Sequence, residues 1–369
     1  MKLIDVDKNF QAATLAGHEV CFRNAIKSPF VLEGFGFPNN SHGPMFRVPD
    51  YVTAESTEPG IIWLASDTSG GAIRFCTDAT FIAVRGTLMK GDSAPHQTMA
   101  GASGMDLYAR DDDGKVRFRS LVPVGQPELA KKAFEFGIWD QGKAGVMQEY
   151  LLNLPTYNGF DSLEIGTNPE AKFGEVPPHK IAKPICFYGS SITQGGCCTR
   201  PGNAYTAMLC REVDASQINL GFSGNARGHI PMARAICELD LSCLVIDYDH
   251  NAPNPEFLAN THEKFFLYIR NEHPELPVIF MTKPDFRRHQ DYLVNRERRE
   301  VVKRTYANAV ARGDRKVWFV DGKSLFEGEG WDGCTVDGCH PNDLGFYRMY
   351  RAVLPALREA LGFPNYITT

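Results

Sequence analysis

The sequence predicts a mixed α/β protein in which a β-rich N-terminal region is followed by an α/β region built on a parallel sheet. Short segments of alternating polarity, separated by Asp, Ser, Gly and Thr, fill roughly the first 165 residues. Two adjacent prolines, Pro177 and Pro178, then interrupt a stretch without periodicity. After them, short apolar strands alternate with helical segments almost to the C-terminus, the pattern of a parallel sheet covered on both faces.

In the N-terminal region, many short strands at close spacing predict a β-sandwich over residues 1–170. The segments 105–110 and 115–120 flank Asp111-Asp112-Asp113-Gly114, an Asp-Gly turn typical of a hairpin. The other predicted strands are residues 61–65, 72–76, 80–86, 146–154 and 162–165.

Residues 171–183 are predicted to be a linker, and residues 184–369 a second domain. Strands are predicted at 184–188, 217–220, 243–248, 277–281 and 316–320. Helices are predicted at 204–213 and 231–239, from Asn254-Pro255 onward, and at about 291–312 and 343–361. In such sheets ligands bind beyond the carboxyl ends of the strands, so loops at this edge are the first candidates for chemistry.

The composition is that of a soluble globular protein. The 369 residues are 43% hydrophobic and 22% charged, with a net charge of −5, so we expect neither a nucleic-acid nor an anionic membrane partner. The chain begins MKLIDVDKNF, without the apolar core of a signal peptide, and we expect a cytoplasmic protein. The ten cysteines contain no C-x-x-C spacing, so we expect no metal site and no cofactor. The sequence leaves open whether the protein forms a homo-oligomer.

Four loops carry candidate chemistry. Ser191 follows the strand 184–188, where a hydroxyl becomes a nucleophile once a base takes its proton; a serine-rich turn is the structural alternative. A glycine-rich loop around Gly224 follows the next strand and could aim backbone N–H groups at a ligand. Asn251 follows the third strand, where its amide could face an oxyanion or simply form a turn.

The fourth loop contains Asp337-Gly338-Cys339-His340-Pro341, directly before the last predicted helix. An aspartate three residues before a histidine can fold back onto the Nδ1–H group of the ring. That contact fixes the tautomer and leaves Nε2 free to act as a base. The nearby His250 is a less suitable base, because it has only Asp247 and Asp249 beside it in a strand-end turn.

The order of these blocks resembles the GDSL, or SGNH, hydrolase family over nearly all of residues 184–360. Ser191 matches the serine of the first block, Gly224 the glycine of the second and Asn251 the asparagine of the third, and Asp337 and His340 match the D-x-x-H-P block. The resemblance implies a three-layer α/β/α domain, a catalytic triad of Ser191, His340 and Asp337, and an oxyanion hole of Ser191, Gly224 and Asn251.

The sequence departs from the family pattern at Ser190 and Ala252, where the family usually has aspartate. Neither position takes part in the expected proton transfers. These departures therefore indicate a divergent branch rather than a lost activity.

A second resemblance concerns Gly104-Met105-Asp106-Leu107-Tyr108, which is similar to the G-x-D-L-Y signature of β-domains that precede SGNH domains in two-domain bacterial proteins. It implies a jelly-roll-like sandwich packed on the hydrolase domain. We expect Asp106 to have a structural role, in a turn or a hydrogen bond.

Together the two resemblances imply a serine esterase that hydrolyses short acyl esters, acetyl esters in particular, on a small-molecule or oligosaccharide substrate. Trp331 could stack on a sugar and Arg200 could bind an anionic group, with loop packing and surface exposure as the structural alternatives. The competing hypotheses are an acyltransferase with the same triad, a carbohydrate-binding protein with an inactive hydrolase domain, and a metal-dependent hydrolase using Asp247, Asp249 and His250.

Overall fold

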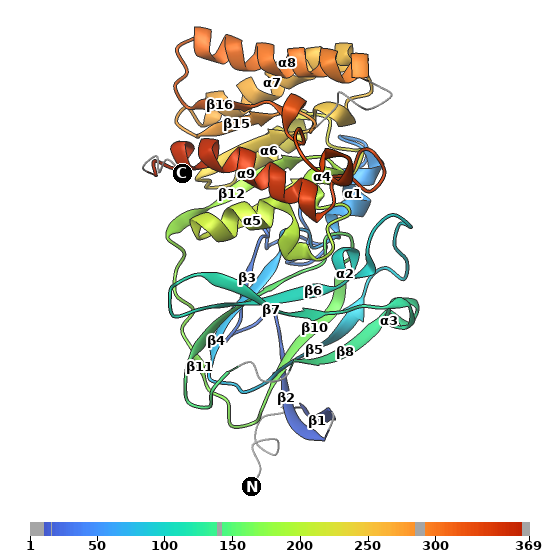
Figure 1. Cartoon of the computed structure of the whole chain (residues 1–369), viewed down its shortest axis with the longest axis vertical. Helices are drawn as coiled ribbons and strands as arrows, with labels where there is room; N and C mark the ends of the chain where they lie inside the picture. Colours follow the sequence, from blue (N-terminus) through green and yellow to red (C-terminus); the bar gives the residue numbers. More distant parts are fainter. Residues whose placement is uncertain (1–10, 16, 139–141, 285–291, 364–369) are drawn as a thin grey trace.

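A computed structural model of the chain describes residues 11–15, 17–138, 142–284 and 292–363. It has the mixed α/β architecture that the sequence predicts, with two antiparallel sheets in the N-terminal region and a parallel five-stranded sheet in the C-terminal region (Figure 1). Residue 291, where the predicted fourth long helix starts, and the N-terminal ten residues lie outside the described ranges. None of the described helices is long and apolar enough to cross a bilayer.

The N-terminal sheets form a sandwich. The first has the strand order β1 (Gln11–Leu15), β2 (His18–Asn24), β10 (Phe160–Thr167), β5 (Ile82–Leu88), β8 (Ala133–Ile138). The second has the order β11 (Phe173–Gly174), β4 (Ala72–Thr77), β9 (Gln148–Asn153), β6 (Met105–Arg110), β7 (Val116–Val122), and β3 (Val31–Glu33) pairs with β4. Inward side chains of both sheets, such as Val84 and Leu152, share one buried core. The connections include α2 (Met99–Ala102) and α3 (Gln126–Lys131).

The parallel sheet has the order β13 (Ala215–Gly221), β12 (Ile181–Gly189), β14 (Cys243–Asp247), β15 (Val278–Met281), β16 (Val317–Val320). Its helices are α4 (Ser191–Gln194), α5 (Tyr205–Val213), α6 (Ile230–Cys237), α7 (Pro255–Glu272), α8 (Tyr292–Ala311) and α9 (Asp343–Ala360).

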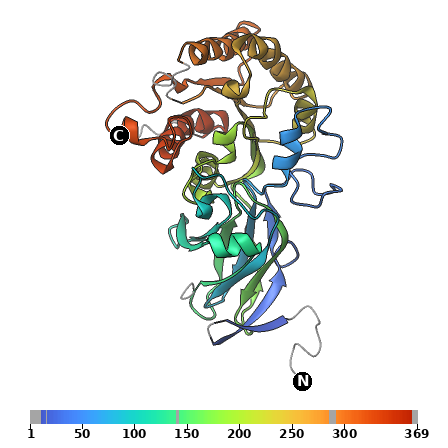
Figure 2. The ribbon, with the colours of Figure 1, turned by 90° about the vertical axis from the view of Figure 1, so that its right-hand side faces the viewer.

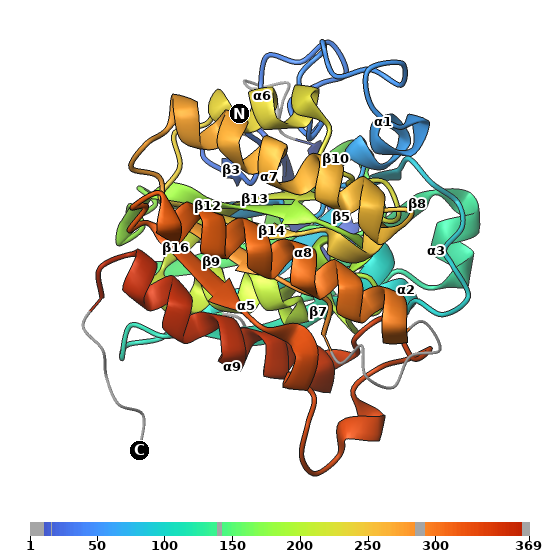
Figure 3. The ribbon, with the colours of Figure 1, turned by 90° about the horizontal axis from the view of Figure 1, so that it is seen from above.

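Because successive side chains of a strand point to opposite faces, the interior strand β12, which lies between β13 and β14, supplies both cores. Cys186 and Tyr188 join the core under α6, α7 and α8, whereas Ile185 and Phe187 join the core under α5 and α9. Figure 3 shows α6 and α9 on opposite sides of the strands.

One predicted element is wrong. Residues 61–65 were expected to be a strand, but they belong to helix α1 (Pro59–Ala65). Pro59 stands in the first turn, where a proline is favourable. Ile61, Leu64 and Ala65 are buried at helical spacing, and a five-residue apolar run does not distinguish a strand from such a helix.

The chain around α1 packs away from the sandwich. Phe37, Val48 and Ile61 belong to the core under α6 and α7, and Figure 2 shows this blue segment beside the parallel-sheet unit. We keep 1–170, 171–183 and 184–369 as proposed limits of the domains and linker, with this part of the first domain packed on the second. The proposed linker includes β11 and the start of β12.

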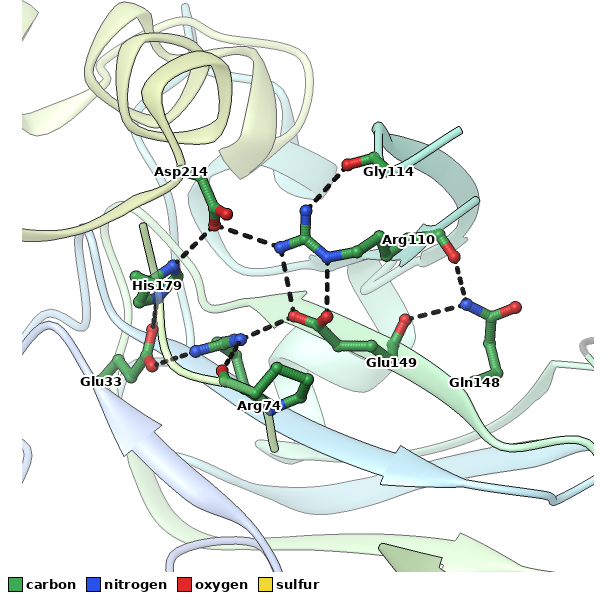
Figure 4. Close-up of polar contacts among 9 residues, drawn as sticks. Glu33, Arg74, Arg110, Gly114, Gln148, Glu149, His179 and Asp214 are labelled. Carbon is green, nitrogen blue, oxygen red and sulfur yellow. Dashed lines mark hydrogen bonds and ion pairs between the residues drawn. The ribbon is translucent and has the colours of Figure 1, made fainter. Parts of the chain in front are cut away.

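A charged network joins the two units on the side drawn in Figure 4. His179 is bonded to Asp214, at the end of α5, through Nδ1 and to Glu33, on β3, through Nε2, both at 3.0 Å. Arg74 and Arg110 complete the network through Glu149, at 2.6 and 2.7 Å. With a carboxylate at each ring nitrogen, His179 satisfies both only as an imidazolium.

We expect His179 to make stability depend on pH. Burial lowers the pKa of His179, but the hydrogen bonds to Asp214 and Glu33 outweigh burial and raise the pKa to about 8. Relative to an unfolded pKa of about 6.5, the charged ring contributes up to roughly 2 kcal/mol below that pH, and this contribution disappears as the pH rises through 8.

The test is urea unfolding of the wild type and His179→Gln at about pH 6 and about pH 9, where the difference in unfolding free energy should be large only at the lower pH. The exposed His42, changed to Gln, is the matched control. A difference of equal size at both values would contradict the assignment.

Candidate active site

Ser191 stands at the carboxyl edge of the parallel sheet and is the first residue of α4, which follows strand β12 after one residue, Ser190. Ser190 caps this short helix, since its Oγ accepts a hydrogen bond of 3.1 Å from the Ile192 N–H. Serine and aspartate are both good helix caps. Ser190 therefore caps the helix as the aspartate usual at this position in the family pattern would. The Ser191 residue itself is only 6% exposed.

The structure brings Ser191, His340 and Asp337 together. Ser191 Oγ lies 2.9 Å from His340 Nε2, and His340 Nδ1 lies 2.7 Å from Asp337 Oδ2. The other oxygen, Asp337 Oδ1, accepts the backbone N–H groups of Cys339 and His340 at 2.9 and 2.7 Å. Nδ1 therefore donates to the carboxylate, and Nε2 is left to accept a proton from the hydroxyl.

The Asp337 carboxylate is suited to this position. Partial burial raises its pKa, but the hydrogen bonds from the His340 backbone and ring and from the Cys339 backbone outweigh burial and lower the pKa to about 2. Asp337 is therefore ionised throughout the neutral range and can stabilise an imidazolium at residue 340.

The loops with Gly224 and Asn251 flank the serine, because β13 and β14 are the two neighbours of β12. Gly224 has a φ of +71°, a conformation that favours glycine. Asn251 is on the 3₁₀ helix Asp249–Asn251 and donates through Nδ2 to the Phe222 carbonyl at 3.1 Å. The Ser223 N–H donates to Gln194 Oε1 at 3.0 Å, which ties the glycine loop to α4.

A cleft of about 520 Å³ opens beside His340. Most of its wall comes from the N-terminal half of the chain, where the sequence predicted no site residue. The lining residues are Gly60, Trp63, Leu64, Lys90, Asp92, Ser93, Ala94, His96, Gln97, Tyr157, Ser223, Asn225 and His340. The one available signal was the polar loop 90–97, with Gly91 and Pro95, since loops on a rigid scaffold often carry function.

Trp63 is the most exposed large apolar side chain of this wall, at 60%. The Lys90 ammonium lies 3.5 Å from the centre of its ring, a cation–π contact that orients the indole. Lys90 is in turn paired with the buried Asp67, whose other oxygen accepts the Gln194 amide at 3.0 Å. One chain of contacts thus connects the indole to the helix of Ser191.

Arg47 stabilises the position of this cleft wall. Its fully buried guanidinium donates to four backbone carbonyls, those of Leu64, Asp67, Asn219 and Gly221, at 2.7 to 2.9 Å. Burial lowers its pKa to about 10, so the group stays charged at neutral pH. The carbonyls belong to the end of α1 and to the end of β13, so Arg47 fixes the cleft wall against the strand that precedes the glycine loop.

The substrate-binding role predicted for Arg200 does not agree with the structure. Its guanidinium pairs with the buried Asp106 at 2.9 Å and lies 4.0 Å from the centre of the Phe118 ring. The charge of Arg200 thus forms an ion pair that joins the parallel-sheet unit to the β-sandwich. Asp106 also accepts the Gly202 N–H, which agrees with its predicted structural role. Trp331 is 40% exposed on the turn Trp331–Gly333 and is not among the residues that line the cleft.

Among the described residues, two groups have metal-ligand atoms within 4.8 Å of one another. The first is Asp247, Asp249 and His250. Asp247 accepts Thr193 and Tyr205 hydroxyls at 3.1 Å, and Asp249 holds the His250 ring at 3.0 Å and the Lys283 N–H at 3.1 Å. Burial raises the pKa of Asp247 to about 6. These contacts connect the end of β14 with α4, with α5 and with the chain after β15.

The second group is His96, Cys197 and His340, of which His96 and His340 line the cleft. His96 comes from the loop 90–97 and Cys197 from the turn after α4. No motif in the sequence connects either residue with the base.

Comparison with known families agrees with the architecture. Residues 182–358 match the GDSL-like lipase/acylhydrolase family. Residues 20–173 match GxDLY, the N-terminus of the SGNH-hydrolase type of esterase. No curated protein matches the chain.

Solved structures show the same two-part fold. A GDSL-like lipase from Bacteroides ovatus is 27% identical, with a TM-score of 0.82, over 94% of this chain and 99% of that one. The salicylyl-acyltransferase SsfX3 of a tetracycline biosynthetic pathway is 18% identical, with a TM-score of 0.72, over 93% and 97%. The acetyl xylan esterase Est2A from Butyrivibrio proteoclasticus is 14% identical, with a TM-score of 0.54, over 93% and 99%.

Proposed function

Because residues 182–358 belong to the GDSL-like lipase/acylhydrolase family and follow a GxDLY domain, we propose that this protein is a serine esterase that removes short acyl groups, acetyl in particular, from a carbohydrate or glycoside. The observation that carries the proposal is the hydrogen-bonded series Ser191–His340–Asp337 beside an open cleft.

The proposed reaction has two halves. Ser191 Oγ attacks the ester carbonyl while its proton passes to His340 Nε2, and the negative charge of the tetrahedral intermediate is held by the N–H groups of Ser191 and Gly224 and by the Asn251 amide. The intermediate collapses as the imidazolium gives its proton to the departing alcohol, leaving an acyl-serine. Water then attacks that ester, with His340 again as the base.

Two features support the substrate class. Ser191 is only 6% exposed, which favours a small acyl group over a bulky one. The cleft beside His340 presents the exposed indole of Trp63 together with the amides of Asn225 and Gln97. An aromatic face with hydrogen-bonding groups around it suits a sugar ring, which is apolar on its faces and polar at its edge.

The decisive experiment compares the wild type with Ser191→Ala on acetylated sugars and on p-nitrophenyl esters of increasing chain length. We expect turnover of acetyl esters only, with a loss of about 10³-fold or more in the variant. A fully active Ser191→Ala would overturn the mechanism, and cleavage of long-chain esters alone would overturn the carbohydrate assignment. Adding an alcohol as acceptor separates hydrolysis from acyl transfer, because transfer yields a new ester instead of the free acid.

Asp337→Asn tests the tautomer argument. The two backbone N–H groups at Oδ1 would hold the amide oxygen of the variant, so its NH₂ group would face His340 Nδ1. The ring would then carry its proton on Nε2 and could not accept one from Ser191. We expect kcat to fall by about 10⁴-fold with the fold intact, measured by steady-state kinetics and circular dichroism. A variant with near-normal kcat would show that the carboxylate does not set the tautomer.

Trp63→Ala tests the sugar-binding wall, with Trp331→Ala as the matched comparison. If the sugar stacks on Trp63, its loss should raise KM for an acetylated sugar by roughly tenfold, about 1.4 kcal/mol. Ethyl acetate, which has no ring to stack, should show no such change. A larger effect of Trp331→Ala would show that the sugar stacks on Trp331, as the sequence predicts.

A further inference from the structure

Three side chains from distant parts of the sequence meet at the edge of the cleft. One ligand atom each of His96, Cys197 and His340 lies within 4.8 Å of the other two. The rings of His96 and His340 are 5.4 Å apart between centres and inclined by 35°. Two imidazoles and one thiol are a ligand set that suits zinc, and none of the three competes for hard cations such as Mg²⁺.

The Cys197 backbone supports a specific role for its side chain. Its φ is +72°, although cysteine carries a Cβ that makes this conformation unfavourable, by about 1 kcal/mol or more. The residue is only 4% exposed and forms no disulfide. Burial, with a smaller effect of Asp337, raises its thiol pKa to about 12, so the uncomplexed side chain is a neutral thiol. A bound cation would reverse this balance and stabilise the thiolate.

His96 supplies what the other two lack. It is exposed on the loop 90–97 and makes no hydrogen bond within the described part of the chain. Its ring can therefore turn toward an incoming cation without breaking a hydrogen bond. By contrast, Cys197 and His340 are held by the turn after α4 and by Asp337.

We propose that His96, Cys197 and His340 form a binding site for zinc or a similarly thiophilic divalent cation, and that occupancy of this site inhibits the esterase. The inhibitory part rests on the proposed function. The cation would take the lone pair of His340 Nε2, so the ring could no longer accept the Ser191 proton. Ser191 Oγ, 2.9 Å from that nitrogen, lies where a fourth ligand could approach. Binding releases the thiol proton to solvent and involves no change of oxidation state.

Metal binding is tested without any catalytic readout, by titrating Cd²⁺ into Ser191→Ala and following the ultraviolet charge-transfer absorption of a metal–thiolate bond. We expect one cation per chain. The absorption should be lost in the double variant with Cys197→Ala, and the affinity should fall at least about tenfold with His96→Gln. Cys339→Ser, which removes a partly exposed thiol next to His340, should leave both unchanged.

Retention of the absorption without Cys197, or its equal loss in Cys339→Ser, would overturn the site. Because His96 is exposed, His96→Gln should fold even where Cys197→Ala does not, and unchanged affinity in that variant would also overturn the proposal.

Inhibition is tested on the wild type with acetyl esters. Zn²⁺ should lower the rate and a chelator should restore it, whereas Mg²⁺ should have no effect. Within His96→Gln and Cys197→Ala, the ratio of rates with and without Zn²⁺ should move toward one, whatever the rate of each variant alone. Equal inhibition of all variants would overturn the inhibitory role. An inactive wild type that still binds Cd²⁺ through Cys197 would refute the proposed esterase and leave the metal site standing.

Discussion

The buried guanidinium of Arg47 is the contact on which the geometry of the whole site depends. A charged group without water is costly, and here four carbonyl acceptors and the face of Phe222, 4.6 Å away, replace its hydration. Each charge-assisted hydrogen bond of this kind contributes about 1.5–3 kcal/mol. The acceptors come from the end of α1 and from β13. All hydrogen bonds of the guanidinium therefore form only when the N-terminal segment packs in this position against the strand before the glycine loop.

This coupling explains why the N-terminal region contributes so much to a site whose proposed nucleophile and base lie in the other unit. Asp67 receives the Gln194 amide at 3.0 Å, and the same Gln194 accepts the Ser223 N–H at 3.0 Å. The wall that carries Trp63 is therefore connected through Asp67 and Gln194 to α4 and to the glycine loop. The N-terminal region thus forms part of the cleft and is not an appended module. A change in its position relative to the parallel sheet would alter the contacts that hold the helix of Ser191.

The sequence predicted those features that depend on local order along the chain. Ser191, Gly224, Asn251 and the Asp337–His340 pair follow strands or precede a helix, so a parallel sheet brings them to one edge whatever the details of packing. The wall could not be predicted this way, because its residues meet Ser191 only through contacts between units. Trp63 could not be predicted as a wall residue for a second reason. It lies in an apolar run of five residues, which is as compatible with a strand as with the helix that forms.

Arg200 shows the opposite error. Its position near Ser191 in the sequence suggested that it binds the substrate. Asp106 lies far away in the sequence, on β6, but its carboxylate pairs with the Arg200 guanidinium at 2.9 Å. The two departures from the family pattern can be understood in the same physical terms. Ser190 replaces an aspartate by another good helix cap, and Ala252 is buried with its carbonyl accepting Arg298 at 2.7 Å. Ser190 makes its contact through the side chain, whereas Ala252 makes its contact through the backbone carbonyl, which any residue would supply. A side chain that only positions backbone can be exchanged for any residue that makes the same contact. The hydroxyl, imidazole and carboxylate that meet at 2.7 to 2.9 Å must in addition suit the proton transfer from hydroxyl to ring that the proposed reaction needs.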